Sequence, residues 1–382
     1  RMNDDSLIAR YRYGAQYVGD FQALRSDIAA KTFIPHQVEF QPPPRGRKIC
    51  WLDCPYCYGG SAHDDGRRLS KSRALEVMAQ IAQGGVKKII FAGYATDPLN
   101  CEYIDDLLRA TIDSGQIFGF NTKALKLSEA FLGQLSRPDI APQSYMSISV
   151  DAGCNEVYNA VHDVRGNAKL YDRVLQCITR AGAARRANGN LFDLSATYLI
   201  NGRNHDVAQV QRFIRDFKAA GCNMLRFAFA QPPRGIETAD GVVPTADDVR
   251  LYGEKLRPVI AAADSAACTT MLVDADSDHD IYDKARTVPC FARFSYPTVG
   301  FDGWLYHCSQ SSAPNFHGMA IGDLNSDDFW PLLYDYDGER LGDYFSACGL
   351  RMNQEGCRCD RKEHVLNARV IASGAFDDLV VK

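Results

Sequence analysis

The sequence lacks several features that would place the protein in a large class at once. It has no apolar run near the roughly eighteen residues that a membrane-spanning helix requires. It has no basic excess, because 43 lysines and arginines stand against 47 aspartates and glutamates, for a formal net charge of −4. Its first residues are polar and helix-patterned and lack the apolar core of a signal peptide. We therefore expect a cytoplasmic protein with no nucleic-acid partner and no membrane partner.

Cysteine is present in an informative amount and in an uneven pattern. Thirteen is an odd count, and in a reducing compartment such residues are metal ligands, catalytic thiols or small core residues more often than disulfides. Three lie in the eight residues from Cys50 to Cys57, and five lie between Cys290 and Cys359. Two groups separated by more than two hundred residues predict two metal centres.

Between these groups, segments with helical spacing alternate with strand-like segments. Strands are expected just before Cys50 and at 88–92, 117–120, 145–150, 191–199 and 224–229, and helices at 70–83, 102–113, 128–135, 168–181, 205–219 and 246–263. This alternation predicts βα units and a parallel sheet, with about six units, too few for a closed eight-stranded barrel. From Cys290 onward the rhythm gives way to short segments with clustered glycine and cysteine. The sequence therefore predicts an α/β fold with an N-terminal helical extension (1–44), a βα core (45–265) and a small cysteine-rich domain with a C-terminal tail (266–382).

The first cysteine group reads Cys50-Trp-Leu-Asp-Cys54-Pro-Tyr-Cys57. Three thiolates on one loop can bind three irons of a cubane and leave the fourth open, whereas such clusters otherwise take four cysteines. A zinc site would need a fourth cysteine or histidine nearby, and His63 is the local candidate. The spacing, with Tyr56 directly before the third cysteine and early in a run of βα units, resembles the signature of the radical SAM superfamily.

The resemblance implies a partial (β/α)6 barrel over about residues 45–265. It implies a [4Fe-4S] cluster that binds S-adenosylmethionine (SAM) at its open iron and cleaves it to a 5′-deoxyadenosyl radical. An external electron donor such as flavodoxin or ferredoxin would supply the electron. The Gly-Gly-Glu usual after the second strand is absent, so the expected SAM-binding residues are matched by position. They are Tyr56, Gly93, Tyr94, Ala95, Thr96, Asn121, Ser149, Asp151 and Arg165.

The second cysteine group contains a Gly303-x4-Cys308 element that resembles the C-terminal SPASM and Twitch extensions of radical SAM enzymes. The resemblance implies an auxiliary iron–sulfur cluster. The seven cysteines and the Cys-x2-Cys-x5-Cys run of a full SPASM domain are absent, so we expect one Twitch-like [4Fe-4S] cluster. A structural zinc in the same thiolates is the alternative. The expected ligands are Cys290, Cys308 and Cys348, with either Cys357 or Cys359 as the fourth.

Two single cysteines lie close to the expected SAM site in the sequence. Cys101 follows the Gly93 segment and Cys154 follows Asp151, and a thiol at either position could return a hydrogen atom to a substrate radical. The alternative is a small buried core residue. Together these features predict an enzyme that epimerises a sugar-containing natural product or other small molecule.

Other functions remain open from the sequence. A dehydrogenase would pass a second electron from a secondary-alcohol radical to the auxiliary cluster. Peptide modification is disfavoured because the residues before Cys50 are mostly one expected helix rather than a peptide-recognition domain. An activating enzyme for a glycyl-radical partner is disfavoured by the Gly303–Cys308 element. A pure electron-transfer protein is the most distant alternative, since an open iron has little use without SAM.

Overall fold

The computed structural model describes residues 20–46, 50–57, 59, 62–93, 96–230, 241–273, 290–354 and 361–379. The chain forms two compact units, each discontinuous in sequence. Unit 1 comprises residues 1–41, 63–88 and 280–382, and unit 2 comprises 42–62 and 89–279. These units do not follow the consecutive ranges 1–44, 45–265 and 266–382, because a strand near residue 39 pairs with one near residue 298.

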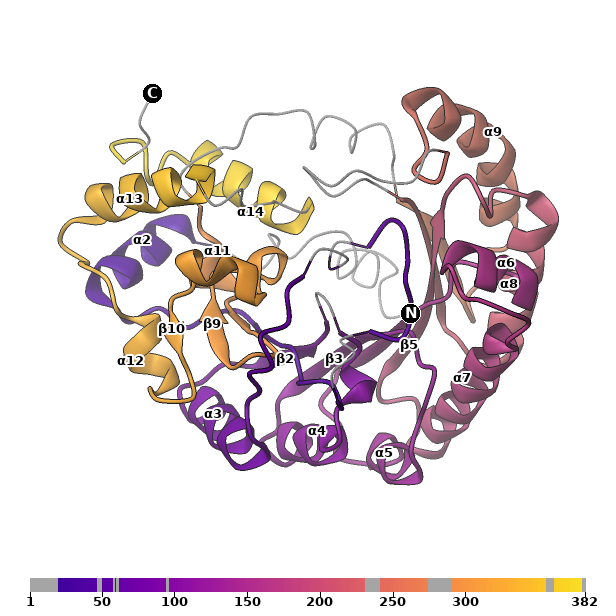
Figure 1. Ribbon diagram of the computed structural model, residues 1–382, viewed down its shortest axis with the longest axis horizontal. Helices are drawn as coiled ribbons and strands as arrows, with labels where there is room; N and C mark the ends of the chain where they lie inside the picture. Colours follow the sequence, from indigo (N-terminus) through magenta and orange to yellow (C-terminus); the bar gives the residue numbers. More distant parts are fainter. Residues whose placement is uncertain are drawn as a thin grey trace. The chain divides into compact units, whose positions relative to one another are not determined.

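Unit 2 is a parallel sheet with helices between successive strands, which confirms the predicted α/β class. Its strands, in both sequence and sheet order, are β2 (Lys88–Phe91, in this unit from Ile89), β3 (Ile117–Thr122), β4 (Tyr145–Ser149), β5 (Asp193–Ile200), β6 (Met224–Phe229) and β7 (Thr269–Leu272). Its helices are the short 3-10 helix η2 (Pro98–Asn100), α4 (Ile104–Asp113), α5 (Glu129–Leu135), α6 (Asn155–Val161), α7 (Leu170–Ala187), α8 (Val207–Ala219) and α9 (Ala246–Ala262). Figure 1 shows α4, α5, α7 and α9 along the outer side of these strands.

The helices lie close to the sheet and to each other because the sequence supplies apolar faces and small residues where they meet. β5 is buried along nearly its whole length, as expected for a parallel strand covered on both faces. Between α7 and α8, a Cβ added to Gly182 would lie 2.2 Å from the carbonyl oxygen of Ala220, so only glycine permits this approach. β7 was missed from the sequence because Thr269–Leu272 is short and has no alternating pattern.

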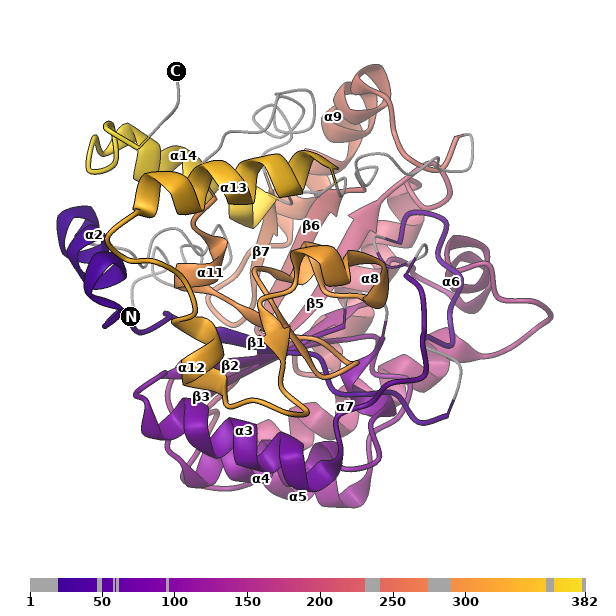
Figure 2. The same cartoon turned by 60° about the vertical axis from the view of Figure 1, so that its left-hand side comes forward.

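Unit 1 combines the first strand of the chain with the C-terminal residues (Figure 2). β1 (Val38–Phe40) pairs in parallel with β8 (Thr298–Val299), which pairs antiparallel with β9 (Trp304–Tyr306), and β9 pairs antiparallel with β10 (Gly322–Asp323). The helices are α2 (Phe21–Ala30), α3 (Lys71–Gln83), α11 (Ala292–Ser295), η3 (Ser309–Ser311), η4 (Pro314–Met319), α12 (Phe329–Leu333), α13 (Leu341–Gln354) and α14 (Arg361–Ala372). In the part of the chain that the structure describes, no helix has both the length and the apolarity needed to cross a membrane.

Candidate functional site

The three cysteines of the first group lie on one loop of unit 2. The backbone N–H of Cys57 donates to the carbonyl of Cys54 at 3.0 Å, which turns the loop between these two residues. The pKa of Cys54 is raised to about 12, chiefly by burial; the Lys123 ammonium lowers it, and the nearby Cys57, Asp151 and Cys50 add smaller upward contributions. Cys50 also lines a small hollow together with Asp97 and Lys123. The loop therefore brings three thiols near one partly buried cation, Lys123.

This arrangement fits a cubane better than a single metal ion. No three histidine, cysteine, aspartate or glutamate side chains among the described residues are close enough to hold one metal ion. Each cysteine of a cubane binds a different iron, so its ligands stand farther apart than those of zinc. Cys50, Cys54 and Cys57 are all partly exposed and can be reached by an incoming cluster. These three residues are therefore the ones that would hold the [4Fe-4S] cluster.

His162 lies directly behind Cys54 and was not expected to take part. Its ring is completely buried, with Nδ1 3.1 Å from the Cys54 Sγ and Nε2 3.2 Å from the carbonyl oxygen of Val150. Burial lowers the pKa of His162 to about 3, so the ring is neutral and carries one N–H. Because the Val150 carbonyl can only accept, that hydrogen belongs on Nε2, and Nδ1 accepts the hydrogen bond of the Cys54 thiol. His162 thus positions the central cysteine of the loop against the end of β4.

Asp151 joins the cysteine loop to the sheet. It follows β4 in the left-handed region, at φ +60°, and is completely buried. Its Oδ2 accepts from the Tyr56 hydroxyl at 3.0 Å and the Lys123 ammonium at 2.9 Å, and its Oδ1 accepts from the Leu199 N–H at 2.7 Å. Burial is the largest single influence and raises the pKa of Asp151, but Lys123 together with the other groups around the carboxylate, including the Leu199 N–H, outweighs it and holds that pKa below its usual value. A buried ion pair therefore anchors Tyr56, which is itself part of the cysteine loop.

The same ion pair shifts the titration of Lys123. Burial is the largest single influence and lowers the pKa of Lys123, but the Asp151 carboxylate together with the nearby Cys54 and Tyr158 outweighs it and raises that pKa. Both groups are therefore charged in the folded protein. Asp151 was expected to contact the SAM ribose, and this remains a prediction; in the structure its carboxylate has protein partners on both oxygens.

The segment after β2 is tied to the end of β3. The Asp97 carboxylate accepts from the Thr122 hydroxyl at 2.7 and 2.9 Å and from the Lys123 N–H at 2.6 Å. Burial raises the pKa of Asp97, and these hydrogen bonds partly offset that rise. The buried Thr96 hydroxyl has no hydrogen-bond partner among the described residues, which suits a loop that receives a polar cofactor. A Cβ on Gly93 would lie 1.8 Å from the Thr96 carbonyl oxygen, so this turn requires glycine.

We expect Gly93→Ala to weaken SAM binding by about tenfold or more, equivalent to about 1.4 kcal/mol, because the turn must open to admit the methyl group. Iron content should not change, since the cysteine loop is separate from this turn. Equilibrium dialysis with labelled SAM and an iron assay measure the two quantities. Gly133→Ala in α5 is the control, because a Cβ there meets nothing within 4 Å. Equal SAM affinity in both variants would contradict a role of this turn.

The other expected SAM contacts lie at the ends of the same strands. Ser149 is the last residue of β4 and is partly buried, while Asn121 in β3 and Arg165 after α6 are exposed. Tyr94 and Ala95 lie outside the described residues. The roles of all these residues toward SAM remain predictions.

The two candidate hydrogen donors differ in accessibility. Cys101 is 5% exposed, and burial raises its pKa to about 12. Cys154 is partly exposed at the start of α6, and its thiol lies 3.1 Å from Glu156 Oε2. Between these two thiols, Cys154 is the one that a substrate can reach more easily.

The second cysteine group is only partly described. Cys290 and Cys308 are both buried, and Cys308 lies directly before η3 at the end of the β8–β9 hairpin. Cys348 lies in α13. Cys357 and Cys359 lie outside the described residues. The auxiliary cluster therefore remains a prediction.

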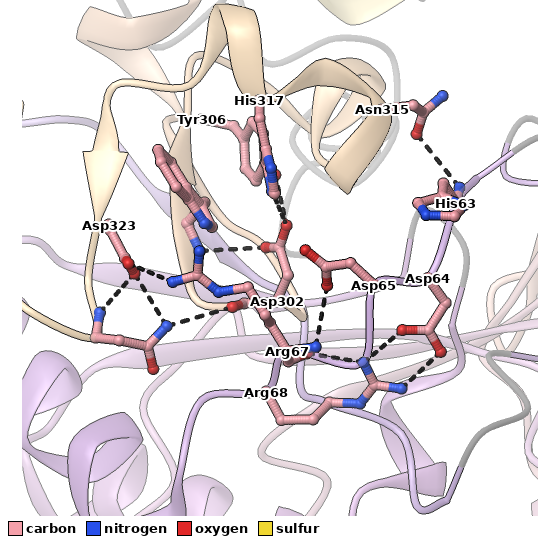
Figure 3. A network of polar contacts seen from close by, with 12 residues as sticks. His63, Asp64, Asp65, Arg67, Arg68, Asp302, Tyr306, Asn315, His317 and Asp323 are labelled. Atoms are coloured by element: carbon pink, nitrogen blue, oxygen red, sulfur yellow. Dashed lines mark hydrogen bonds and ion pairs between the residues drawn. The ribbon is translucent and has the colours of Figure 1, made fainter.

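A buried acid, Asp302, organises the hairpin that carries Cys308 (Figure 3). It accepts from the Tyr306 hydroxyl at 2.6 Å, His317 Nε2 at 2.9 Å and the Trp304 N–H at 3.1 Å. Burial raises the pKa of Asp302, and the hydrogen bonds from Tyr306 and His317 partly lower it again. His317 also stacks on Trp304, with ring centres 4.6 Å apart. The strand leading to Cys308 is therefore held rigidly from its turn to its end.

Comparison with known proteins agrees with this geometry. The Radical SAM superfamily matches residues 48–194 of the sequence. This range includes the cysteine loop, Asp97, Asp151 and His162. Residues 48–194 are a radical SAM domain. The family implies a [4Fe-4S] cluster and SAM, and the described residues of this domain fit both. An uncharacterized protein of Archaeoglobus fulgidus is 27% identical over 130 residues, which are 34% of this chain. The matched part spans 29% of that relative.

Solved structures show the same fold. The fold of this chain is similar to that of Streptococcus suis SuiB bound to precursor peptide SuiA, with a TM-score of 0.58 and 14% identity. The match covers 83% of this chain and 69% of SuiB. SuiB bound to S-adenosylmethionine gives a TM-score of 0.55 at 14% identity, over 81% and 68% of the two chains. The structure of anSMEcpe with bound AdoMet gives 0.56 at 14% identity, over 90% and 94%. At this level of identity the likeness concerns the fold alone.

Proposed function

We propose that this chain is a radical SAM enzyme that epimerises one carbon of a sugar-containing small molecule, with Cys154 as the hydrogen donor. The accessible thiol of Cys154 carries the proposal, because it lies three residues after Asp151 at the carboxyl end of β4. Ligands of open parallel sheets bind beyond this edge. The bound cluster and SAM would supply a 5′-deoxyadenosyl radical that removes a hydrogen atom from the substrate.

The chain's own residues supply position. Cys50, Cys54 and Cys57 would hold the cluster, and the buried His162 ring, with Nδ1 3.1 Å from the Cys54 Sγ, packs behind the central ligand. The Lys123–Asp151 ion pair anchors the same loop through the Tyr56 hydroxyl.

The proposed epimerisation moves two hydrogen atoms and consumes two electrons. The substrate carbon loses one hydrogen atom to the adenosyl carbon and gains one from the Cys154 sulfur on the opposite face. The thiol then needs one electron and one proton to re-form, and SAM cleavage consumes one further electron. A one-electron reductant of the flavodoxin or ferredoxin class would supply both electrons.

Two alternatives involve the same domain. In a dehydrogenase, the auxiliary cluster would accept an electron from a radical next to oxygen, and no hydrogen would return. A peptide-modifying maturase is the other alternative, since the fold is shared with SuiB, which was solved with a precursor peptide. Cys154 favours epimerisation over both, because neither alternative requires a hydrogen donor at that edge.

We expect reconstituted enzyme with SAM and dithionite in D2O to place deuterium at the epimerised carbon of a sugar-containing substrate found by panel screening. Cys154→Ala should still form 5′-deoxyadenosine but release no deuterated epimer, because the second hydrogen has no source. Cys177→Ala, a buried cysteine of α7, is the matched control and should behave as the unaltered protein. Mass spectrometry and chromatography measure both products. A product that is oxidised by two electrons and contains no deuterium would instead support the dehydrogenase. If Cys154→Ala still forms the deuterated epimer and Cys101→Ala does not, the hydrogen donor is Cys101.

A further inference from the structure

A hollow of about 510 Å³ opens on unit 1, away from the cysteine loop in the sequence. All of its lining residues lie between 293 and 347, so it belongs to unit 1 alone and falls outside the radical SAM domain at 48–194. Neither Cys290 nor Cys308 lines it. Pockets for small molecules commonly measure roughly 300–1,000 Å³, so the hollow has the size of a ligand site.

The buried side of the hollow is formed by a guanidinium group. Arg293 in α11 is 4% exposed, and its Nε and Nη2 donate to three backbone carbonyl oxygens at and just after the end of α12, at 2.9–3.2 Å. Its guanidinium carbon lies 5.0 Å from the ring centre of Tyr336 and 5.6 Å from that of Tyr344. These contacts hold the group in one position at the wall of the hollow.

Arg293 has hydrogen-bonding capacity and charge that the protein leaves unmatched. Its Nη1 carries two hydrogens, and the one acceptor for them among the described residues is the Tyr344 hydroxyl at 3.4 Å. Every hydrogen-bond partner of Arg293 in the described part of the chain is a carbonyl or hydroxyl oxygen, and none is a carboxylate. A buried arginine rarely lacks an anionic partner. A carboxylate on a ligand would be that partner.

The exposed side of the hollow is acidic. Asp335, Asp337 and Asp343 stand there against one cation, Arg340, whose Nε is 3.8 Å from Asp337 Oδ2. Within the described ranges, neither Asp335 nor Asp343 forms an ion pair. Asp335 lies directly beside Arg293, because its backbone carbonyl oxygen accepts from Arg293 Nη2 at 3.1 Å. The hollow therefore presents an unmatched cation next to unmatched carboxylates.

This pairing of charges selects among ligand classes. A polyamine would be repelled by the guanidinium, and a phosphate or a dicarboxylate would be repelled by the acidic side. A zwitterion satisfies both sides. In an α-amino acid the carboxylate and the ammonium are attached to the same carbon, so their partners must be adjacent, as Arg293 and Asp335 are. Met319 and Ile321 add apolar wall that can contact an aliphatic side chain.

We propose that the hollow binds a free α-amino acid, with its carboxylate on Arg293 and its ammonium on Asp335 and Asp343. The site is separate from the proposed epimerisation. Formation of 5′-deoxyadenosine therefore neither supports nor contradicts it.

The test uses the full chain, reconstituted with iron and sulfide and kept without SAM, because SAM itself carries an α-amino acid group. Ligand-observed saturation-transfer NMR measures the binding of L-alanine, L-leucine, L-glutamate and L-lysine. The N-acetyl form and the amide of the tightest binder follow. We expect the free amino acid to bind, and each blocked form to bind at least about tenfold more weakly, because each lacks one of the two charges.

Variants assign this binding to the hollow. Asp335→Asn should weaken binding of the free amino acid about tenfold and leave the N-acetyl form unaffected, because it removes a partner of the ammonium alone. Arg293→Lys should weaken both forms, since a lysine ammonium does not reproduce the planar fork of a guanidinium. Glu339→Gln is the control, because Glu339 is an exposed acid of the same connection that does not line the hollow. Circular dichroism verifies each fold, and Asp335→Asn decides the test should Arg293→Lys fail to fold.

Three outcomes would overturn the inference. The first is that none of the four amino acids binds. The second is that the N-acetyl form or the amide binds as tightly as the free amino acid, so that only one charge is recognised. The third is equal affinity in Asp335→Asn and in the unaltered protein, which would place the binding elsewhere, such as at the open iron of the cluster.

Discussion

Cys54→Ala is expected to lose about four irons per chain and to reduce 5′-deoxyadenosine formation by more than ~100-fold. The loop would then present two thiolates to a cluster that needs three from the protein. Loss of an outer partner of a metal ligand already costs about 10–100-fold, and loss of the ligand itself costs more. The central position also loses its hydrogen bond to His162. Anaerobic reconstitution, an iron assay and chromatography of the nucleoside product measure the effect.

The matched control is Cys222→Ala, which removes a buried cysteine between α8 and β6. It should retain full iron and product formation. The iron that Cys54→Ala retains reports on the second cysteine group. About four irons per chain would support an auxiliary cubane, and the absence of iron would mean that the second group holds no cluster. Full product formation by Cys54→Ala would contradict the assignment of the first loop.

The fold was largely predictable because its signal is local. Alternating apolar segments mark β3, β4, β5 and β6 within a few residues of their observed bounds. β7 was not found because four residues carry too little pattern to distinguish a strand from a connection. The pairing of β1 with β8 joins residues more than two hundred positions apart, and no local pattern reports such a pairing.

Site residues that belong to a sequence motif were predictable. Site residues whose role depends on burial and on distant partners were not. The spacing of the three cysteines identifies their loop without a structure. His162 and Asp97 were missed as positioning residues because their importance lies in partners distant in the sequence. A weak signal did exist for Asp97, since Thr-Asp-Pro directly follows the expected glycine turn. The polar residues of the alternation Gln-Val-Glu-Phe-Gln at 37–41 are also buried, whereas that pattern usually indicates a solvent-exposed face.

Lys123→Met is expected to destabilise the protein by about 3–5 kcal/mol, because it leaves the Asp151 carboxylate charged and buried without its ammonium partner. Asp151 has no exposed surface, and the Lys123 side chain is 18% exposed. Urea unfolding at matched iron content measures the loss. Lys126→Met, three residues further along and exposed, is the control and should change stability by no more than about 0.5 kcal/mol.

The double variant Lys123→Met/Asp151→Asn separates the ion pair from packing. Replacing a buried ion pair by neutral groups of similar volume is often tolerated, so the double variant should be more stable than Lys123→Met alone. A local readout comes from the Leu199 amide, which donates to Asp151 and should exchange its hydrogen faster in Lys123→Met. A loss below about 1 kcal/mol in the single variant would show that the pair contributes little.

The same substitution tests how stability and cluster binding are linked. Tyr56 lies between Cys54 and Cys57 and is held by the carboxylate that Lys123 neutralises. When Asp151 loses this partner, the Tyr56 hydroxyl loses a fixed acceptor and the cysteine loop loses its tether to β4. Lys123→Met should therefore retain less iron than Lys126→Met even at temperatures where both are folded. Equal iron retention at equal folded fraction would mean that the ion pair supports the sheet and leaves the cysteine loop unaffected.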